Sequence, residues 1–174
     1  MQLVGLALRG RPGASVVDIG AGTSRLVDAL LESSPDVTVL DVSREALDES
    51  ARRLGPRAEQ VSWIRADLLD WLPERNYDVW HDRAVFHFLS TAEDIPAYVD
   101  LASSAVAPDG ALVLAVFAPN GPTSCSGLPA TRYDAATLAA HFDAAFVLEH
   151  EERELHHTPA GATQPFTWVV LRRR

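Results

Sequence analysis

Two glycines and two aspartates stand at the ends of successive apolar runs. Gly20 and Gly22 follow the first run, Asp41 closes the second, and Asp67 closes the third. Glycines let a chain turn tightly and let a ligand approach the backbone closely. An aspartate roughly 20 residues after such a turn is placed to accept hydrogen bonds from ribose hydroxyls. An acid at the end of the next strand can accept from an adenine amino group. Together these residues indicate a site for an adenine nucleoside.

Three kinds of ligand compete for this glycine turn. A phosphate loop of the Walker type needs a lysine followed by serine or threonine, which the turn lacks. A dinucleotide fingerprint needs a third glycine where Arg25 stands. S-adenosylmethionine carries no phosphate, so polar residues such as Ser24 can meet its amino-acid end. Asp41 alone does not distinguish between these ligands, because nicotinamide cofactors require the same acid. Asp41 and Asp67 together favour S-adenosylmethionine.

The elements that must position these residues alternate between strands and helices. Strands are predicted at 16–19, 37–42, 61–67, 77–82 and 111–118, and helices at 25–32, at 43–54, from the capping pattern at 90–94 onward, and at 134–142. The turn-rich gap between "AFVLEHEEREL" and "QPFTWVVL" predicts an antiparallel hairpin at the sheet edge. We therefore expect one α/β domain over residues 1–174, with a doubly wound, Rossmann-like sheet of about seven mostly parallel strands.

Composition and charge exclude several classes of function. The 174 residues carry a formal net charge of −9, which argues against a nucleic-acid surface. No apolar run approaches the ~20 residues that span a bilayer, and the N-terminus lacks a basic leader. A single cysteine, Cys125, permits no internal disulfide. We expect a cytoplasmic protein without a nucleic-acid or membrane partner.

The order of the motifs resembles the class I S-adenosylmethionine-dependent methyltransferases. The matching segments are "VVDIGAGTS", "VTVLDVS", "RADLLDW", "YDVWHDRAVFHFL" and "APDGALVLAVFAP". The resemblance implies a seven-stranded sheet whose last strand is antiparallel. It also implies that Asp18, Gly20 and Gly22 cradle the methionine end of S-adenosylmethionine, that Asp41 binds the ribose, and that Asp67 binds the adenine.

Three further residues complete the expected cofactor site, and the sequence departs from the family pattern in two places. We add Ser24, Val42 and Leu68 to the cofactor site, with Leu68 covering the adenine ring. Ser24 stands where the commoner family motif has a third glycine. About fifteen residues precede the first predicted strand, whereas family members usually carry a longer segment that folds over the substrate.

The end of the fourth predicted strand is the expected substrate side. His81, Asp82 and Arg83 are the catalytic candidates. An oxygen or ammonium nucleophile needs a base, which His81 could supply with Asp82 as its orienting group. The simpler interpretation, that both only contact the donor or hold the strand end, is favoured here. This segment resembles thiopurine S-methyltransferases and, in position, tellurite-resistance methyltransferases. That resemblance suggests a small soft or anionic acceptor, such as a thiol, which Arg83 could pair with.

Other residues leave alternatives open. Arg132 and Tyr133 could meet substrate, or Tyr133 and Asp134 could simply begin a helix. His87 lies in an apolar run and is expected to be packed. His156 and His157 point to opposite faces of a strand, so no metal is predicted. The leading hypothesis is a methyltransferase acting on a small molecule. A protein lysine N-methyltransferase and a non-catalytic S-adenosylmethionine-binding module are the alternatives.

Overall fold

A computed structural model describes residues 2–33, 36–158 and 161–174. Its strands that form the main sheet are β1 (Ser15–Ile19), β2 (Asp36–Asp41), β3 (Val61–Arg65), β4 (Tyr77–Arg83), β5 (Val106–Phe117), β8 (Phe146–His157) and β9 (Thr163–Arg173). The helices are α1 (Gln2–Leu8), α2 (Leu26–Ser33), α3 (Arg44–Leu54), α4 (Asp94–Ala105) and α5 (Ala135–Ala140). Short 3₁₀ segments η1 (Gly55–Gln60) and η2 (Phe86–Phe88), and a small ribbon of β6 (Ser124–Cys125) and β7 (Leu128–Pro129), complete the chain.

The sheet has seven strands in the order β3-β2-β1-β4-β5-β9-β8. β1 to β5 are parallel to one another, while β9 is antiparallel to both β5 and β8. The doubly wound α/β fold and its antiparallel terminal hairpin are thus confirmed. Because parallel strands end at the same edge, the residues that follow β1, β2, β3 and β4 all gather at one edge of the sheet.

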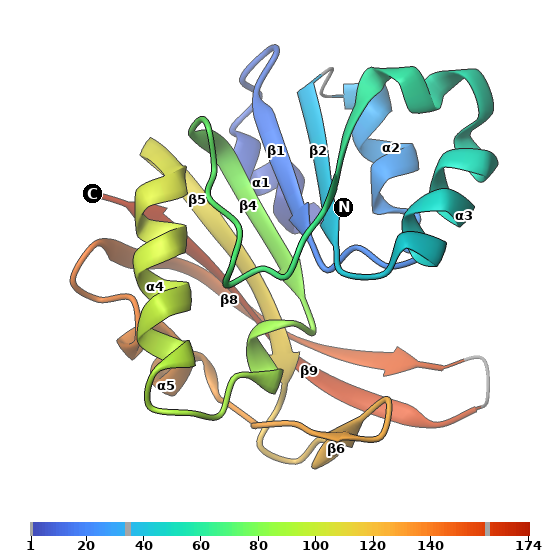
Figure 1. Cartoon of the computed structure of the whole chain (residues 1–174). Helices are drawn as coiled ribbons and strands as arrows, with labels where there is room; N and C mark the ends of the chain where they lie inside the picture. The colour runs from blue at the N-terminus through green and yellow to red at the C-terminus, as the bar shows by residue number, and fades with distance from the viewer. Residues whose placement is uncertain (1, 34–35, 159–160) are drawn as a thin grey trace.

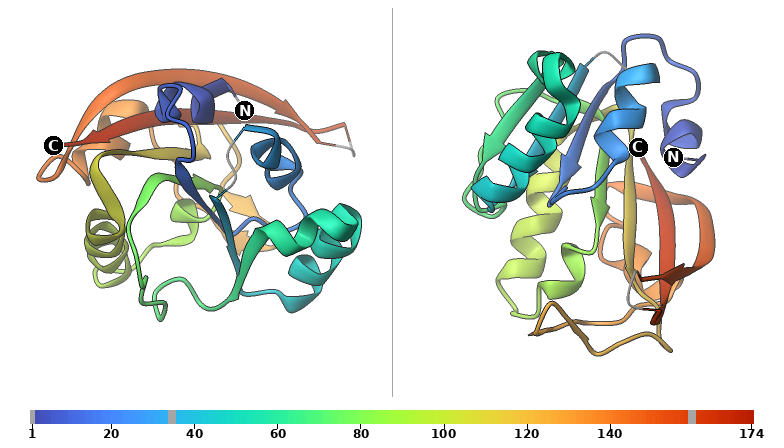
Figure 2. Two further views of the ribbon diagram at one scale, coloured as in Figure 1. Left: turned by 90° about the horizontal axis from the view of Figure 1, so that it is seen from above. Right: turned by 90° about the vertical axis from the view of Figure 1, so that its right-hand side faces the viewer.

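Two hydrophobic layers cover the two faces of the sheet. One layer joins α1, α2 and α3 to the strands through residues such as Val4, Leu30 and Val79. The other joins α4 and α5 through Trp80, Tyr98 and Leu138. Figure 1 shows α4 in front of the strands and α1 behind them. Figure 2 shows α1 alongside the long β8–β9 hairpin. The α1 face also carries the cavities described below.

Side-chain caps explain where several predicted elements begin. Ser43 caps α3, since its Oγ accepts from the backbone N–H of Ala46 at 3.2 Å. The Asp134 carboxylate accepts from the N–H of Thr137 at 2.8 Å and caps α5, so helix initiation is one role of this segment. Before α4, Thr91 Oγ1 accepts from the N–H of Asp94 at 3.0 Å, within the segment 90–94 that predicted the start of this helix.

The structure corrects the sequence-based boundaries in three places. Helix α1 was not predicted. The "APDG" segment, which precedes the strand predicted at 111–118, lies inside β5, where the pairing with β4 shifts register and Asp109 has a φ of 57°. On α4 the buried positions are Tyr98, Ala102 and Ala105. Sequence analysis did not single out Tyr98, because tyrosine is amphipathic.

No helix in the described ranges is long and apolar enough to cross a membrane.

Candidate active site

The turn after β1 is held together from within. Gly20 and Gly22 have φ angles of 59° and 55°, a conformation that residues with a Cβ rarely adopt. The N–H groups of Gly20 and Ala21 bond to Leu40 O, and that of Ser24 bonds to Ala21 O. The N–H of Gly22 donates to Asp41 Oδ2 at 2.7 Å. Four N–H groups of the turn are therefore already paired, which leaves few donors for a pyrophosphate.

Asp41 connects the turn to the start of α3. Its Oδ2 accepts from Gly22, and its Oδ1 accepts from the N–H of Ser43 at 2.8 Å. The Asp41 side chain is buried at the C-terminal end of β2. Each carboxylate oxygen has two acceptor positions, so these bonds leave capacity for a further donor such as a hydroxyl. Asp41 holds the glycine turn in shape, a function that the sequence motif did not reveal.

The third strand end presents an accessible acid beside an apolar surface. Asp67 is exposed, and its Oδ1 accepts from the N–H of Leu69 at 3.0 Å. Val42 is 66% exposed at the end of β2, which makes its side chain available to cover a flat ring. Leu68, by contrast, is buried in the core layer that includes Trp71 and Trp80. Of the two apolar candidates, Val42 and not Leu68 offers free side-chain surface.

A buried imidazole–carboxylate pair bridges the ends of β1 and β4. His81 Nδ1 lies 2.7 Å from Asp18 Oδ1, and the side chains are 7% and 3% exposed. The β1–β4 register pairs Asp18 directly with His81, so the two side chains leave the same face of the sheet. The other oxygen of Asp18, Oδ2, is buried and has no hydrogen-bond partner within the described residues.

Asp82 faces the opposite side of the sheet from His81. Its Oδ2 accepts from the Tyr98 hydroxyl at 2.7 Å and from the N–H of Phe86 at 3.1 Å, and its Oδ1 accepts from the N–H of Val85 at 2.9 Å. Asp18, and not Asp82, is therefore the carboxylate that contacts His81. Adjacent residues of a strand point to opposite faces, so Asp82 cannot turn toward the ring of His81.

Full burial is the main influence on the pKa of Asp82. It raises the pKa of Asp82 to about 6, although hydrogen bonds from Tyr98 and from the backbone of Val85 and Phe86 pull in the other direction. The network continues to Trp80, whose Nε1 donates to the Tyr98 hydroxyl at 3.0 Å. Asp82 anchors the segment after β4, where Ala84 has a φ of 71°.

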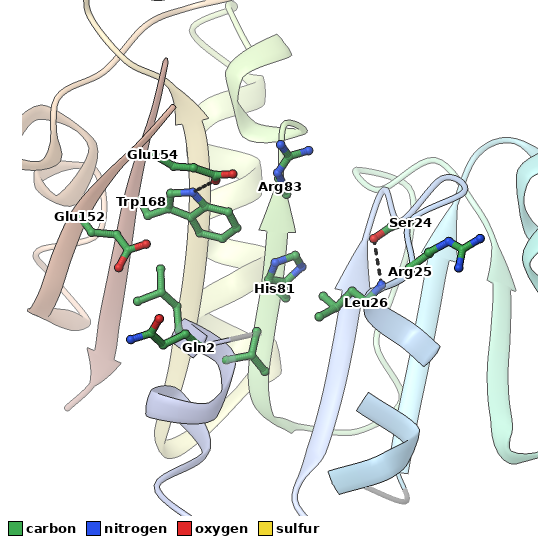
Figure 3. A pocket seen from close by; sticks show the side chains of 11 residues that line it. Gln2, Ser24, Arg25, Leu26, His81, Arg83, Glu152, Glu154 and Trp168 are labelled. Carbon is green, nitrogen blue, oxygen red and sulfur yellow. Dashed lines mark hydrogen bonds between the residues drawn. The ribbon is translucent and has the colours of Figure 1, made fainter. Parts of the chain in front are cut away.

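Two neighbouring cavities open on the α1 face, and His81 lines both. The first, of about 260 Å³, is lined by the glycine turn together with Asp18, His81 and Arg83. The second, of about 400 Å³, lies between α1, the start of α2 and the β8–β9 hairpin. It is lined by Gln2, Leu3, Val4, Ser24, Arg25, Leu26, His81, Arg83, Glu152, Glu154 and Trp168. Figure 3 shows His81 and Trp168 projecting toward this second cavity.

The far wall of the larger cavity comes from parts of the chain to which sequence analysis assigned no role. Glu152 and Glu154 lie on β8, and Trp168 lies opposite Glu152 on β9. Trp168 Nε1 donates to Glu154 Oε2 at 2.6 Å (Figure 3). The one available signal was the alternation of acids at 152 and 154 on a predicted strand, which places both on one face.

Arg83 and His87 lie close to this wall in different settings. The Arg83 guanidinium lies over the ring of Phe166, 4.5 Å from its centroid, and Arg83 lines both cavities. His87 is fully buried and packs against Phe117 at 4.6 Å between ring centroids, so the expectation of a packed histidine is confirmed. Burial, assisted by the charge of Arg83, lowers the pKa of His87 to about 4.

Neither Arg132 nor Tyr133 lines the two cavities around His81. Tyr133 is buried against Phe86, and Arg132 Nη1 donates to the carbonyl oxygen of Gly121 at 3.5 Å. Within the described ranges, no group of three or more His, Cys, Asp or Glu side chains is placed to hold a metal ion.

Comparisons with known proteins agree with this geometry. Nodulation protein S of Rhizobium tropici is 27% identical over 112 residues, which are 64% of this chain and 47% of that protein. The chain thus spans about half of the length of this curated relative. The N-methyltransferase NodS of Bradyrhizobium japonicum, solved with S-adenosyl-L-homocysteine, superposes with a TM-score of 0.79 at 18% identity, covering 99% of this chain and 84% of that one.

A second solved structure has the same fold. The 1,6-didemethyltoxoflavin-N1-methyltransferase of Burkholderia thailandensis, with 1,6-didemethyltoxoflavin and S-adenosylhomocysteine bound, has a TM-score of 0.79 at 22% identity, covering 98% of this chain and 75% of that one. A family described as "Methyltransferase domain" matches residues 17–112, which is more than half of the chain and runs from β1 into β5. The chain therefore belongs to the methyltransferase domain family.

Proposed function

We propose that this protein transfers a methyl group from S-adenosylmethionine to a small molecule held between α1 and the β8–β9 hairpin. The observation that carries the proposal is the pair of adjoining cavities that share His81, Arg83 and Ser24. One cavity adjoins the glycine turn, and the other has the volume and the mixed apolar and polar lining of a small-molecule site. Family membership and the related structures that bind S-adenosylhomocysteine support the same assignment.

The residues around the glycine turn fit the proposed cofactor at its amino-acid end. Asp18 Oδ2 is a buried carboxylate oxygen without a partner among the described residues, which suits the α-ammonium group. Arg83 lines the same cavity and would meet the α-carboxylate. The paired N–H groups of the turn disfavour a pyrophosphate, which further supports this ligand over a dinucleotide.

The nucleoside end would be held at the ends of β2 and β3. Asp41 would accept from the ribose hydroxyls, Asp67 from the adenine amino group, and the exposed side chain of Val42 would cover the ring. When bound, S-adenosylmethionine supplies an electrophilic methyl group on sulfur. The contribution of the protein is to place the acceptor atom in line with that group and to keep it there, which supplies much of the rate in a displacement.

Two acceptor classes are compatible with the residues around His81. A thiol or another soft anion, the hypothesis drawn from the sequence, would be paired by Arg83 and would need no base. An amine would need a base, for which the His81–Asp18 pair is suited. The carboxylates of Glu152 and Glu154 on the cavity wall favour the amine.

Calorimetry with S-adenosylhomocysteine and with NAD tests the cofactor assignment directly. We expect saturable S-adenosylhomocysteine binding in the micromolar range and none for NAD. NAD binding without a response to S-adenosylhomocysteine would refute the assignment.

A screen of acceptors then tests the rest of the proposal, with formation of S-adenosylhomocysteine as the readout. The panel contains small thiols, small amines, carboxylates and a lysine-containing peptide. We expect turnover with small molecules. Preference for the peptide would indicate a protein lysine methyltransferase, and cofactor binding without any turnover would indicate a non-catalytic module.

A further inference from the structure

The tautomer of His81 follows from its buried partner. Nδ1 lies 2.7 Å from Asp18 Oδ1, in a place where both side chains are almost completely shielded from solvent. A carboxylate can only accept, so Nδ1 must carry the proton of this hydrogen bond. In a neutral imidazole Nε2 then holds the free lone pair. Asp18 thus leaves Nε2 as the ring nitrogen of His81 that is available to accept a proton.

The position of His81 places this lone pair where two ligands would meet. The ring lines the cavity of the glycine turn and also the cavity of the β8–β9 wall. In the larger cavity the ring of His81 faces Trp168, with 5.9 Å between the ring centroids. Figure 3 shows the imidazole between the glycine-turn side and this wall. A base at the junction can reach an acceptor atom without blocking either cavity.

The wall opposite His81 combines carboxylates with an indole. The hydrogen bond from Trp168 Nε1 to Glu154 fixes the orientation of the indole. Glu152 lies beside it on the same strand face, with 3.6 Å between its Oε2 and His150 Nε2. A carboxylate next to an aromatic face attracts ammonium groups and repels thiolates and carboxylates.

The positive groups around the cavities do not cancel this preference. Arg83 is shared with the glycine-turn cavity and lies over Phe166, so it is placed to serve the amino-acid end of the cofactor. Arg25 is exposed at the start of α2, on the opposite side of the cavity from β8 (Figure 3). The acceptor side therefore presents Glu152 and Glu154, which lie near His150 and His156, together with the ring of His81.

We propose that the acceptor is a small amine and that Asp18 positions His81 as the base that deprotonates it. This inference rests on the proposed function. The ammonium form of the acceptor gives one proton to Nε2, and the freed nitrogen lone pair forms the new N–C bond. The electron pair of the broken C–S bond stays on sulfur, which leaves S-adenosylhomocysteine and a methylated ammonium product. His81 then returns its proton to solvent.

Matched small probes separate the charge preference from turnover. Benzylamine and benzoate have similar size and opposite charge, and their binding to the S-adenosylhomocysteine complex can be followed by NMR. We expect benzylammonium to bind at least about tenfold more tightly than benzoate. The Glu152→Gln variant should weaken benzylammonium at least about fivefold, whereas Glu151→Gln, on the other face of β8, should not. Tighter binding of benzoate would overturn the proposal.

The role of Asp18 has a spectroscopic signature. The ¹⁵N shifts of the His81 ring should report a protonated Nδ1 and a bare Nε2 in the wild type. In Asp18→Asn the amide can donate as well as accept, so we expect a mixture of tautomers and weaker S-adenosylhomocysteine binding. Unchanged ring shifts in Asp18→Asn would refute the positioning role of Asp18.

Turnover with benzylamine and with benzyl mercaptan completes the test. His81→Ala should lower methylation of the amine by about 10²–10⁴-fold, and that of the thiol by less than tenfold. The control His157→Ala removes an exposed histidine of β8 and should change neither rate. Preferential methylation of the thiol, with no loss in His81→Ala, would overturn the amine assignment while leaving the proposed methyltransferase function intact. Absence of S-adenosylhomocysteine binding in the wild type would instead refute the proposed function.

Discussion

Neighbouring ionisable residues on the two faces of β4 lie in different surroundings. On the α1 face, His81 pairs with Asp18 and lines two cavities, and one oxygen of Asp18 is left without a partner among the described residues. On the α4 face, Asp82 is fully enclosed and each of its oxygens accepts a hydrogen bond. The difference teaches that two adjacent residues of one strand can differ completely in their access to a ligand: one face of β4 opens on cavities and the other is closed by the core.

Removing the carboxylate of Asp82, on the α4 face of β4, should have the largest effect on stability. Asp82→Ala leaves the Tyr98 hydroxyl and two backbone N–H groups without acceptors, so we expect a loss of about 2–4 kcal/mol in the free energy of unfolding. His81→Ala should cost at least about 1 kcal/mol less, because water can enter from the adjoining cavity. Urea unfolding followed by circular dichroism measures both variants. Equal losses would contradict the contrast between the two faces.

On the ligand side, Asp41 should matter for cofactor affinity. Asp41→Ala removes the acceptor of Gly22 and of the proposed ribose hydroxyls, so S-adenosylhomocysteine binding should weaken by about 1–3 kcal/mol. Asp48→Ala, an exposed acid of α3 that lies near Arg44, serves as the matched control. Calorimetry that finds wild-type affinity in Asp41→Ala would eliminate its role at the ribose.

The pH dependence of stability reports on the titration of Asp82, the buried acid on the α4 face of β4. The pKa of Asp82 in the folded state, about 6, lies above the ordinary value of 3.8. The folded state therefore binds more protons than the unfolded state between these values, and the contribution of Asp82 to stability is lost as pH rises through about 6. Relative to Asp82→Asn, the wild type should lose stability from about pH 4 to about pH 7. Parallel pH curves for the two proteins would show that Asp82 does not titrate in this way.

The smallest expected effect concerns the turn that leads into α4, the helix that carries Tyr98. Thr91→Ala removes the acceptor of the Asp94 N–H and should cost about 0.5–2 kcal/mol of unfolding free energy, without changing S-adenosylhomocysteine affinity. Ser90→Ala is the control and should cost less than about 0.5 kcal/mol, since Ser90 is exposed and away from the cap. A larger loss in Ser90→Ala would mean that Ser90, and not Thr91, stabilises the start of α4 in solution.

Local sequence patterns were sufficient for the fold class and for the strand ends that meet at the glycine turn. Apolar runs, capping residues and glycines act over a few neighbours, and parallel pairing forces the ends of β1 to β4 to one edge. That is why Gly20, Asp41 and Asp67 could be placed at one edge of the sheet without coordinates, whereas Asp18 was proposed only from the family resemblance. The role of Asp41 as acceptor for Gly22 could not, because a residue type does not specify which donor it meets.

Only the tertiary structure determined which acid contacts His81 and which residues lie across the cavity from its ring. Asp82 is adjacent to His81 in sequence, but strand geometry sends their side chains to opposite faces, and the β1–β4 register brings Asp18 instead. Glu152, Glu154 and Trp168 reach the site only because β9 inserts between β5 and β8 and carries the hairpin past α1. Sequence by itself determined the strand ends that could bind a nucleoside. Long-range pairing, which no local pattern encodes, determined the far wall of the larger cavity and the partner of His81.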